Sequence, residues 1–193
     1  MADEGSDNRN DFRELCYHIG LALVTWQRVE DLHFEIFGRF LGVPLGKITS
    51  VAYHSTESFN ARNTMLDRMA YYFTRPIKEL IPRELAREYK AAWVEWANLH
   101  KLLKDANLNR DKLAHYAADY DLINMRQEGD NILFDVTSHT LRPSPFNAVS
   151  EYLGRTKDRK EHNLGVPEIN QYVIEFRQAE AACAAFLLRL AGC

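Results

Sequence analysis

An arginine, an aspartate and a histidine lie close together in the segment 109–116, which reads NRDKLAHY. A guanidinium binds a phosphate through paired N–H donors, and an imidazole transfers a proton near neutral pH. Arg110 and His115 are therefore the minimum set for metal-free chemistry on a phosphodiester. Asp111 and His115, four residues apart, share a face of a regular helix, so that Asp111 can fix the tautomer of the imidazole.

The same spacing of arginine and histidine occurs twice more, at Arg13 and His18 and at Arg28 and His33, both inside one long helical pattern. Arg110 differs because it follows Asn109, a residue type that often caps a helix. We therefore predict a short, separate helix that starts at Arg110, where exposed N–H groups would favour a phosphate. The alternative is that the capped helix merely carries solvated charges, with His115 placed favourably near its C-terminal end.

Four long segments must position this group. Apolar residues recur at three- and four-residue steps over residues 11–41, 56–74, 82–105 and from 167 to the end, which predicts four amphipathic helices. We expect them to form an all-α, up-and-down four-helix bundle. The short helix with Arg110 would follow the third of them, because Asn107 and Asn109 are expected to break the chain.

The apolar period changes after His115. The stretches 119–124 and 131–136 alternate like strands around Gly129, so we expect a small β-hairpin over about 118–137, before the last helix. Residues 138–165 mix proline, glycine and charge, with a basic run at 155–160, and are expected to form a loop insertion. Residues 1–10 are polar and acidic and are expected to be a disordered tail, which leaves 11–193 as a single domain.

The composition restricts the function further. A chain of 193 residues with 46% hydrophobic content can bury one sizeable core, and it contains no apolar run of membrane-spanning length. We expect a cytoplasmic protein without a membrane partner. A net charge of −3 argues against extensive wrapping of nucleic acid, although a small local site stays open. Cys16 and Cys183 fall on apolar helix faces and suggest neither a disulfide framework nor a zinc site.

Glu30 and His33 lie three residues apart on the apolar stripe of the first helix. Glu-x-x-His is half of a di-iron site in a helical bundle, but the chain has no second copy, so we expect neither a metal nor another cofactor. The pair is expected to be a buried, mutually satisfied acid and base, or else to support the Arg110 group in the folded bundle.

The chain resembles the HEPN superfamily (higher eukaryotes and prokaryotes nucleotide-binding domain). Its signature is an arginine, usually followed by a polar residue, and a histidine after four to six residues, as at Arg110, Asp111 and His115. The segments 26–32 (WQRVEDL) and 58–66 (SFNARNTML) are also similar to the corresponding helices of such proteins. The resemblance covers about residues 11–120 and the last helix.

The resemblance implies a metal-independent endoribonuclease, in which the 2′-hydroxyl of RNA attacks the adjacent phosphate. One base and one acid are needed, and a homodimer would supply two histidines and two arginines at its interface. Arg110 would stabilise the phosphate charge, His115 would be the acid or base, and Asp111 would orient it. A toxin or defence role would bring an antitoxin or a nucleotidyltransferase partner, although Ala117 stands where some toxin members carry a modified tyrosine.

Two alternatives remain open at the level of sequence. A HEPN-like domain without turnover could use the same three residues to bind RNA, a nucleotide or a protein partner in a regulatory role. A plain helical scaffold could instead present one face of its bundle to another protein.

Overall fold

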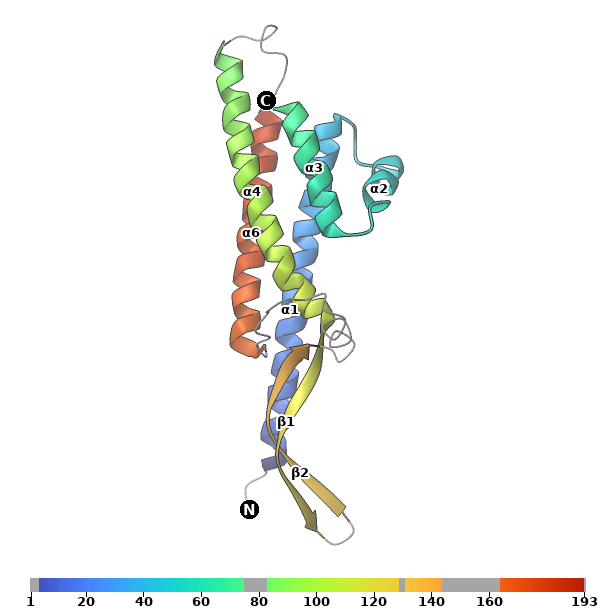
Figure 1. Ribbon diagram of the computed structural model, residues 1–193, viewed down its shortest axis with the longest axis vertical. Coiled ribbons are helices and arrows are strands. Elements are labelled where there is room, and N and C mark those ends of the chain that lie inside the picture. Colours follow the sequence, from blue (N-terminus) through green and yellow to red (C-terminus); the bar gives the residue numbers. More distant parts are fainter. Residues whose placement is uncertain (1–3, 75–82, 129–130, 144–163, 193) are drawn as a thin grey trace, which may run out of the picture. The chain divides into compact units, whose positions relative to one another are not determined.

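The computed structural model describes residues 4–74, 83–128, 131–143 and 164–192, and the side chains of 12–74, 86–114 and 164–191. The chain is predominantly helical, as expected, and Figure 1 shows the order of its elements. The helices are α1 (Glu4–Leu41), α2 (Lys47–His54), α3 (Phe59–Phe73), α4 (Arg83–His115) and α6 (Val166–Gly192), and the strands are β1 (Tyr116–Glu128) and β2 (Asn131–Pro143). No helix among these residues is both long and apolar enough to cross a membrane.

Contacts divide the chain into two compact units. The first unit combines Met1–Leu23 with Arg110–Val173, and the second combines Val24–Asn109 with Ile174–Cys193. Three helices, α1, α4 and α6, therefore contribute residues to both units. Helix α1 already begins at Glu4, inside the segment 1–10 for which we expected a disordered tail.

The first unit contains a two-stranded antiparallel sheet. Strands β1 and β2 pair from Tyr116 opposite Pro143 to Glu128 opposite Asn131, with an irregular register between Asp121 and Asn124. Both strands are longer than the alternating stretches 119–124 and 131–136, and β2 continues into residues 138–143 of the expected loop insertion. The rest of that insertion, including the basic run 155–160, lies outside the described residues.

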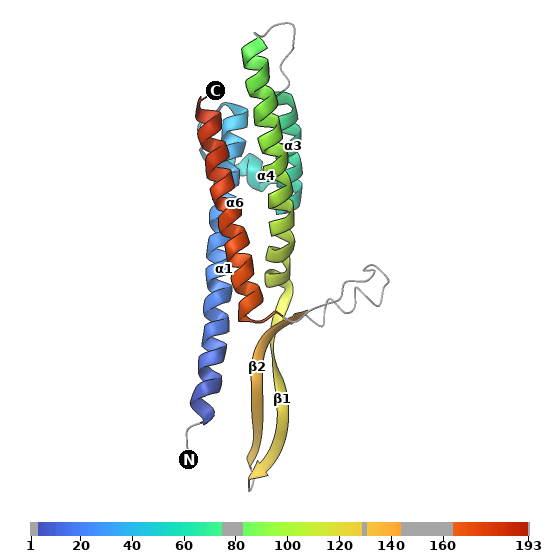
Figure 2. The ribbon, with the colours of Figure 1, turned by 90° about the vertical axis from the view of Figure 1, so that its left-hand side faces the viewer.

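The second unit is a bundle of α1, α3, α4 and α6 around a common core (Figure 2). The core side chains come from the apolar stripes that predicted the helices, and all are less than a tenth exposed; the largest include Trp26, Ile36, Leu66, Trp96, Leu103, Phe176 and Phe186. Burial of such side chains contributes roughly 1.5–3 kcal/mol each. Cys183 also lies in this core, whereas Cys16 in the first unit is exposed, contrary to its expected place on a buried face.

The expected up-and-down order of the bundle is wrong, because α3 runs parallel to α1. The start of α3 meets the middle of α1, where the rings of Phe59 and Trp26 lie 4.7 Å apart. The end of α3 meets the end of α1, where the rings of Phe73 and Phe40 lie 5.3 Å apart. The connection between them, residues 42–58, carries the chain back along the bundle and contains α2.

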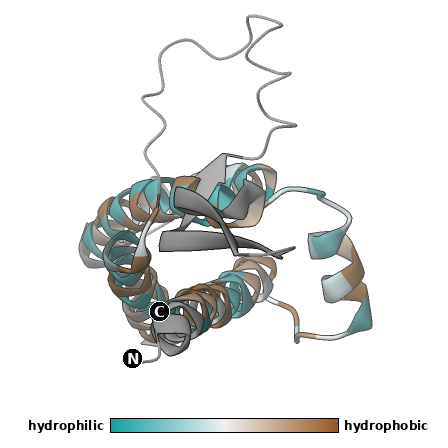
Figure 3. Cartoon of the chain, turned by 90° about the horizontal axis from the view of Figure 1, so that it is seen from below, coloured by the Kyte–Doolittle hydropathy of each residue, from teal (hydrophilic) through white to brown (hydrophobic). Residues whose placement is uncertain are grey.

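Helix α2 has eight residues and was not predicted from the sequence. Its pattern is the reverse of an ordinary surface helix, since Ile48 and Val51 are 88% and 71% exposed while Thr49 and Tyr53 are buried. Such a short segment, rich in β-branched residues, gives no clear helical period. In Figure 3, which looks along the bundle, this short helix stands at the side, joined to the long helices by loops.

The separate motif helix is also a wrong prediction. Helix α4 runs unbroken through Asn107 and Asn109 to His115. Asn107 is only 7% exposed, and the Nδ2 of Asn109 donates a hydrogen bond of 2.6 Å to Glu175 Oε2 on α6. These tertiary contacts outweigh the modest helix propensity of asparagine, which costs less than about 0.7 kcal/mol per residue.

Candidate functional site

Arg110 and Asp111 lie in the last two turns of α4. Nη1 of Arg110 donates a hydrogen bond of 3.2 Å to Oδ1 of Asp111, and the two side chains are 36% and 45% exposed. Because both remain partly exposed, the guanidinium can still meet a ligand at the surface. An ion pair this exposed stabilises the fold by less than about 1 kcal/mol.

His115 is the last residue of α4, and its side chain lies outside the described residues. The backbone alone places it relative to its neighbours, because each helical residue turns by about 100°. Asp111 and His115 therefore share one face, whereas Arg110 and His115 are about 140° apart around the helix axis. A single copy of this helix does not set Arg110 and His115 side by side.

The position at the end of α4 changes the electrostatic expectation. We predicted that Arg110 would begin a helix whose free N–H groups favour a phosphate. Arg110 instead lies near the C-terminal end of a 33-residue helix, where the exposed groups are carbonyls that favour positive charge. Attraction of an anion must therefore come from side chains, and Arg110 is the principal candidate.

Lys112 is a second cation beside Arg110 and Asp111. It was not selected from the sequence as a candidate site residue. Its Nζ donates a hydrogen bond of 3.5 Å to the hydroxyl of Tyr172 on α6 and lies 5.7 Å from the centre of that ring. Its position two residues after Arg110 in the sequence was the signal that could have identified Lys112. Lys112 adds positive charge to this end of α4.

The three arginine–histidine pairs lie in different surroundings in the structure. His33 is completely buried, and burial is the main reason that its pKa is lowered to about 3. An inaccessible neutral ring cannot exchange a proton with an external substrate, which excludes His33 as a catalytic acid or base. His18, in the first unit, has its Nε2 3.8 Å from Glu14 Oε1, one helical turn away.

The expected mutual pair of Glu30 and His33 is not formed. Glu30 accepts a hydrogen bond of 2.7 Å from Trp26 Nε1 and one of 3.1 Å from Nη2 of Arg62 on α3. His33 instead bonds Tyr53 and Asn63, at 2.6 and 3.4 Å. The sequence signalled that both residues face the core but could not show which partners they find on other helices.

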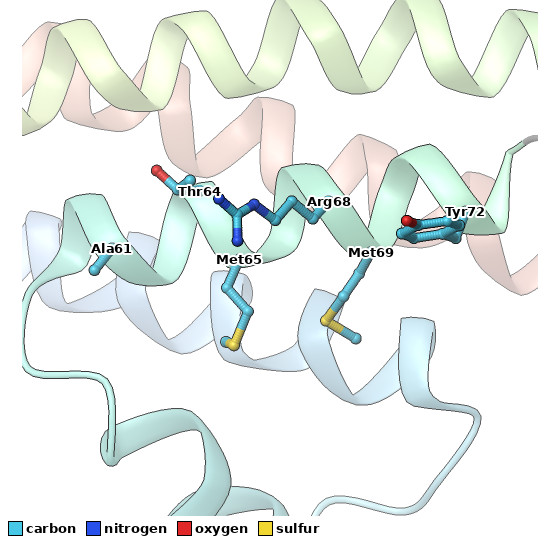
Figure 4. A pocket seen from close by; sticks show the side chains of 6 residues that line it. All are labelled: Ala61, Thr64, Met65, Arg68, Met69 and Tyr72. Atoms are coloured by element: carbon cyan, nitrogen blue, oxygen red, sulfur yellow. The ribbon is translucent and has the colours of Figure 1, made fainter.

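Among the described residues of the second unit, two surface hollows stand out, and neither is lined by Arg110 or Asp111. One, of about 520 Å³, is a largely apolar groove along α3, with Met65 and Met69 side by side in Figure 4. The other, of about 740 Å³, lies where α1 ends and includes Glu35, Arg39 and Tyr89. Among the described side chains, no three His, Cys, Asp or Glu residues gather closely enough to hold a metal ion.

Comparison of the chain with protein-family models, with curated proteins and with solved structures found no match.

Proposed function

We propose that this chain is a HEPN-like, metal-independent endoribonuclease that acts as a homodimer. The observation that carries the proposal is the partly exposed pair of Arg110 and Asp111 in the final turns of α4, which ends at His115. The resemblance seen in the sequence assigns the catalytic roles to these three residues, and of the fold that it implies the predominantly helical character is what supports the proposal.

The chemistry requires two proton-transfer groups. A base removes the proton of the 2′-hydroxyl of RNA, the resulting oxygen attacks the adjacent phosphate, and an acid protonates the leaving 5′-oxygen. One copy offers one histidine at this position, about 140° around the helix axis from Arg110. Two copies related by a two-fold axis would offer both histidines, while the two arginines would stabilise the developing charge.

The competing function is binding without turnover. The partly exposed Arg110 can exchange Asp111 for a phosphate and hold it whether or not a proton transfer follows. The same residues would then retain RNA, a nucleotide or a protein partner in defence or stress regulation, whereas an antitoxin or nucleotidyltransferase partner would favour the toxin ribonuclease. Measurement of cleavage separates the two functions, because both predict binding of RNA.

We expect RNA cleavage by the purified chain to continue in excess chelator and to leave cyclic phosphate and 5′-hydroxyl ends, because side chains alone perform the proton transfers. Gel analysis of a labelled RNA, with end-group determination by mass spectrometry, measures both properties. Cleavage that stops with chelator and returns with magnesium or manganese would indicate metal-assisted hydrolysis instead. RNA binding without cleavage would favour the regulatory function.

A further inference from the structure

Helix α2 is attached to the rest of the second unit through very few side chains. Within the described residues, every hydrogen bond or ring contact from α2 to another helix passes through Tyr53 or His54. Tyr53 is fully buried, whereas Lys47, Ile48, Val51, Ala52 and His54 are exposed. The connections 42–46 and 55–58 join α2 to α1 and α3, and buried Thr49 bonds backbone groups of the first of them.

The bond that holds Tyr53 belongs to a chain of hydrogen bonds across four helices. Nδ2 of Asn63 on α3 donates to the carbonyl oxygen of His100 on α4, at 3.3 Å, which leaves Oδ1 of Asn63 as the acceptor that faces His33 Nε2. Nε2 of His33 must therefore carry the proton and donate it. Nδ1 is then the free acceptor, and it receives the hydroxyl hydrogen of Tyr53 at 2.6 Å.

This arrangement favours a neutral His33. A second proton on Nδ1 would reverse the bond, so that Nδ1 donates to the Tyr53 oxygen and the hydroxyl hydrogen loses its acceptor. It would also bury a positive charge near Arg62 on α3 and His100 on α4. Glu30, on the same helix as His33, is already neutralised by Arg62. Burial raises the pKa values of Tyr53 on α2 and Cys183 on α6, so that both stay neutral. Asp31 on α1 also acts on Tyr53 through its charge.

We propose that α2 is a latch on the helical bundle, closed by the hydrogen bond from Tyr53 to the neutral ring of His33 and released when His33 takes up a proton. The latch is independent of the function proposed for the end of α4. Because an isolated helix of eight residues is only marginally stable, α2 melts when it leaves the bundle.

The direction of the pH effect follows from the two states of His33. In the closed state burial lowers the pKa of His33 from 6.5 to about 3, whereas in the open state the ring meets water and regains its ordinary value. A lowered pKa means that the closed state binds fewer protons than the open one. The closed latch is thus fully favoured above pH 6.5 and progressively lost as the pH falls from 6.5 towards 3.

Amide hydrogen exchange tests the latch in the full chain. Between pH 7 and pH 5, after correction for the intrinsic exchange rates, protection of the amides of residues 51–54 should fall by roughly 25-fold, the linkage expected for these two pKa values. At both pH values the amides around Trp96 and Leu99 in α4 should stay far better protected than those of α2, because their exchange needs global unfolding, whereas α2 needs only the latch to open. Equal protection of α2 at both pH values, or protection of α2 equal to that of α4, would overturn the proposal.

Variants of two histidines show which of them causes the pH dependence of α2 exchange. His33→Gln should abolish the pH dependence of α2 exchange, since glutamine does not titrate. His54→Gln removes the exposed histidine of α2 itself and should retain the dependence. Tyr53→Phe should reduce protection of α2 already at pH 7, because the closing hydrogen bond is lost. A full 25-fold fall in His33→Gln, or its loss in His54→Gln, would also contradict the latch.

Discussion

Replacement of His115 by alanine is expected to lower RNA cleavage by roughly 10²–10⁴-fold, the usual contribution of a positioned acid or base. Arg110→Ala should reduce cleavage to a similar degree. Arg110→Lys should restore only part of it, because an ammonium lacks the planar fork that matches two phosphate oxygens. Initial rates on a labelled RNA, measured with substrate in excess, give these ratios.

Stability and a matched histidine supply the controls for this series. The Arg110 side chain is 36% exposed and its partner is more so, therefore the free energy of unfolding of Arg110→Ala should stay within about 0.5 kcal/mol of wild type. His18→Ala removes the histidine of another arginine–histidine pair and should leave cleavage intact. Equal activity of wild type and His115→Ala, with RNA binding retained in both, would overturn the enzyme function and favour the binding function.

The second large effect is expected in the core of the helical bundle. Glu30→Ala should lower the free energy of unfolding by about 3 kcal/mol, because it leaves the buried guanidinium of Arg62 without its counter-charge and Trp26 Nε1 without an acceptor. The side chains of Arg62 and Glu30 are only 10% and 16% exposed, so water compensates little for the loss. Urea unfolding followed by circular dichroism measures the change.

An exposed ion pair between the same kinds of residues provides the comparison. Arg28 and Glu180 lie 3.9 Å apart, with Arg28 65% exposed, and Glu180→Ala should change stability by no more than about 0.5 kcal/mol. The double variant Glu30→Leu, Arg62→Met should recover much of the stability lost in Glu30→Ala, because it removes both buried charges together. A loss below about 1 kcal/mol in Glu30→Ala would show that the buried pair is not a main support of the bundle.

Apolar periodicity was sufficient to predict α1, α3 and α6, since each has a continuous stripe that the core buries. It failed where tertiary contacts decide. The two asparagines of α4 favour a break locally, but one is buried and Asn109 bonds Glu175 on a helix 66 residues away. The apolar residues of the short helix α2 are exposed, so that no buried apolar stripe predicted it. Without α2, the sequence could not predict that α3 runs parallel to α1.

The candidate site, like the fold, was predicted from the sequence only in part. Residue types and spacing selected Arg110, Asp111 and His115, and the close pairing of Arg110 with Asp111 follows from their adjacency. The sequence did not predict that these residues lie at the C-terminal end of a helix, because that position depends on the unbroken course of α4. The partners of Glu30 and His33 were equally hidden, since Arg62, Tyr53 and Asn63 come from segments 20 to 32 residues away.

A mixed dimer tests the composite site most directly. Wild-type and His115→Ala chains with different affinity tags can be refolded together, and the dimer that carries both tags can be purified and assayed on the labelled RNA. If cleavage needs one histidine as base and the partner's as acid, the mixed dimer should be nearly as inactive as the His115→Ala homodimer, within about tenfold. Half of the wild-type activity in the mixed dimer, or full activity of a strict monomer in sedimentation, would contradict the account.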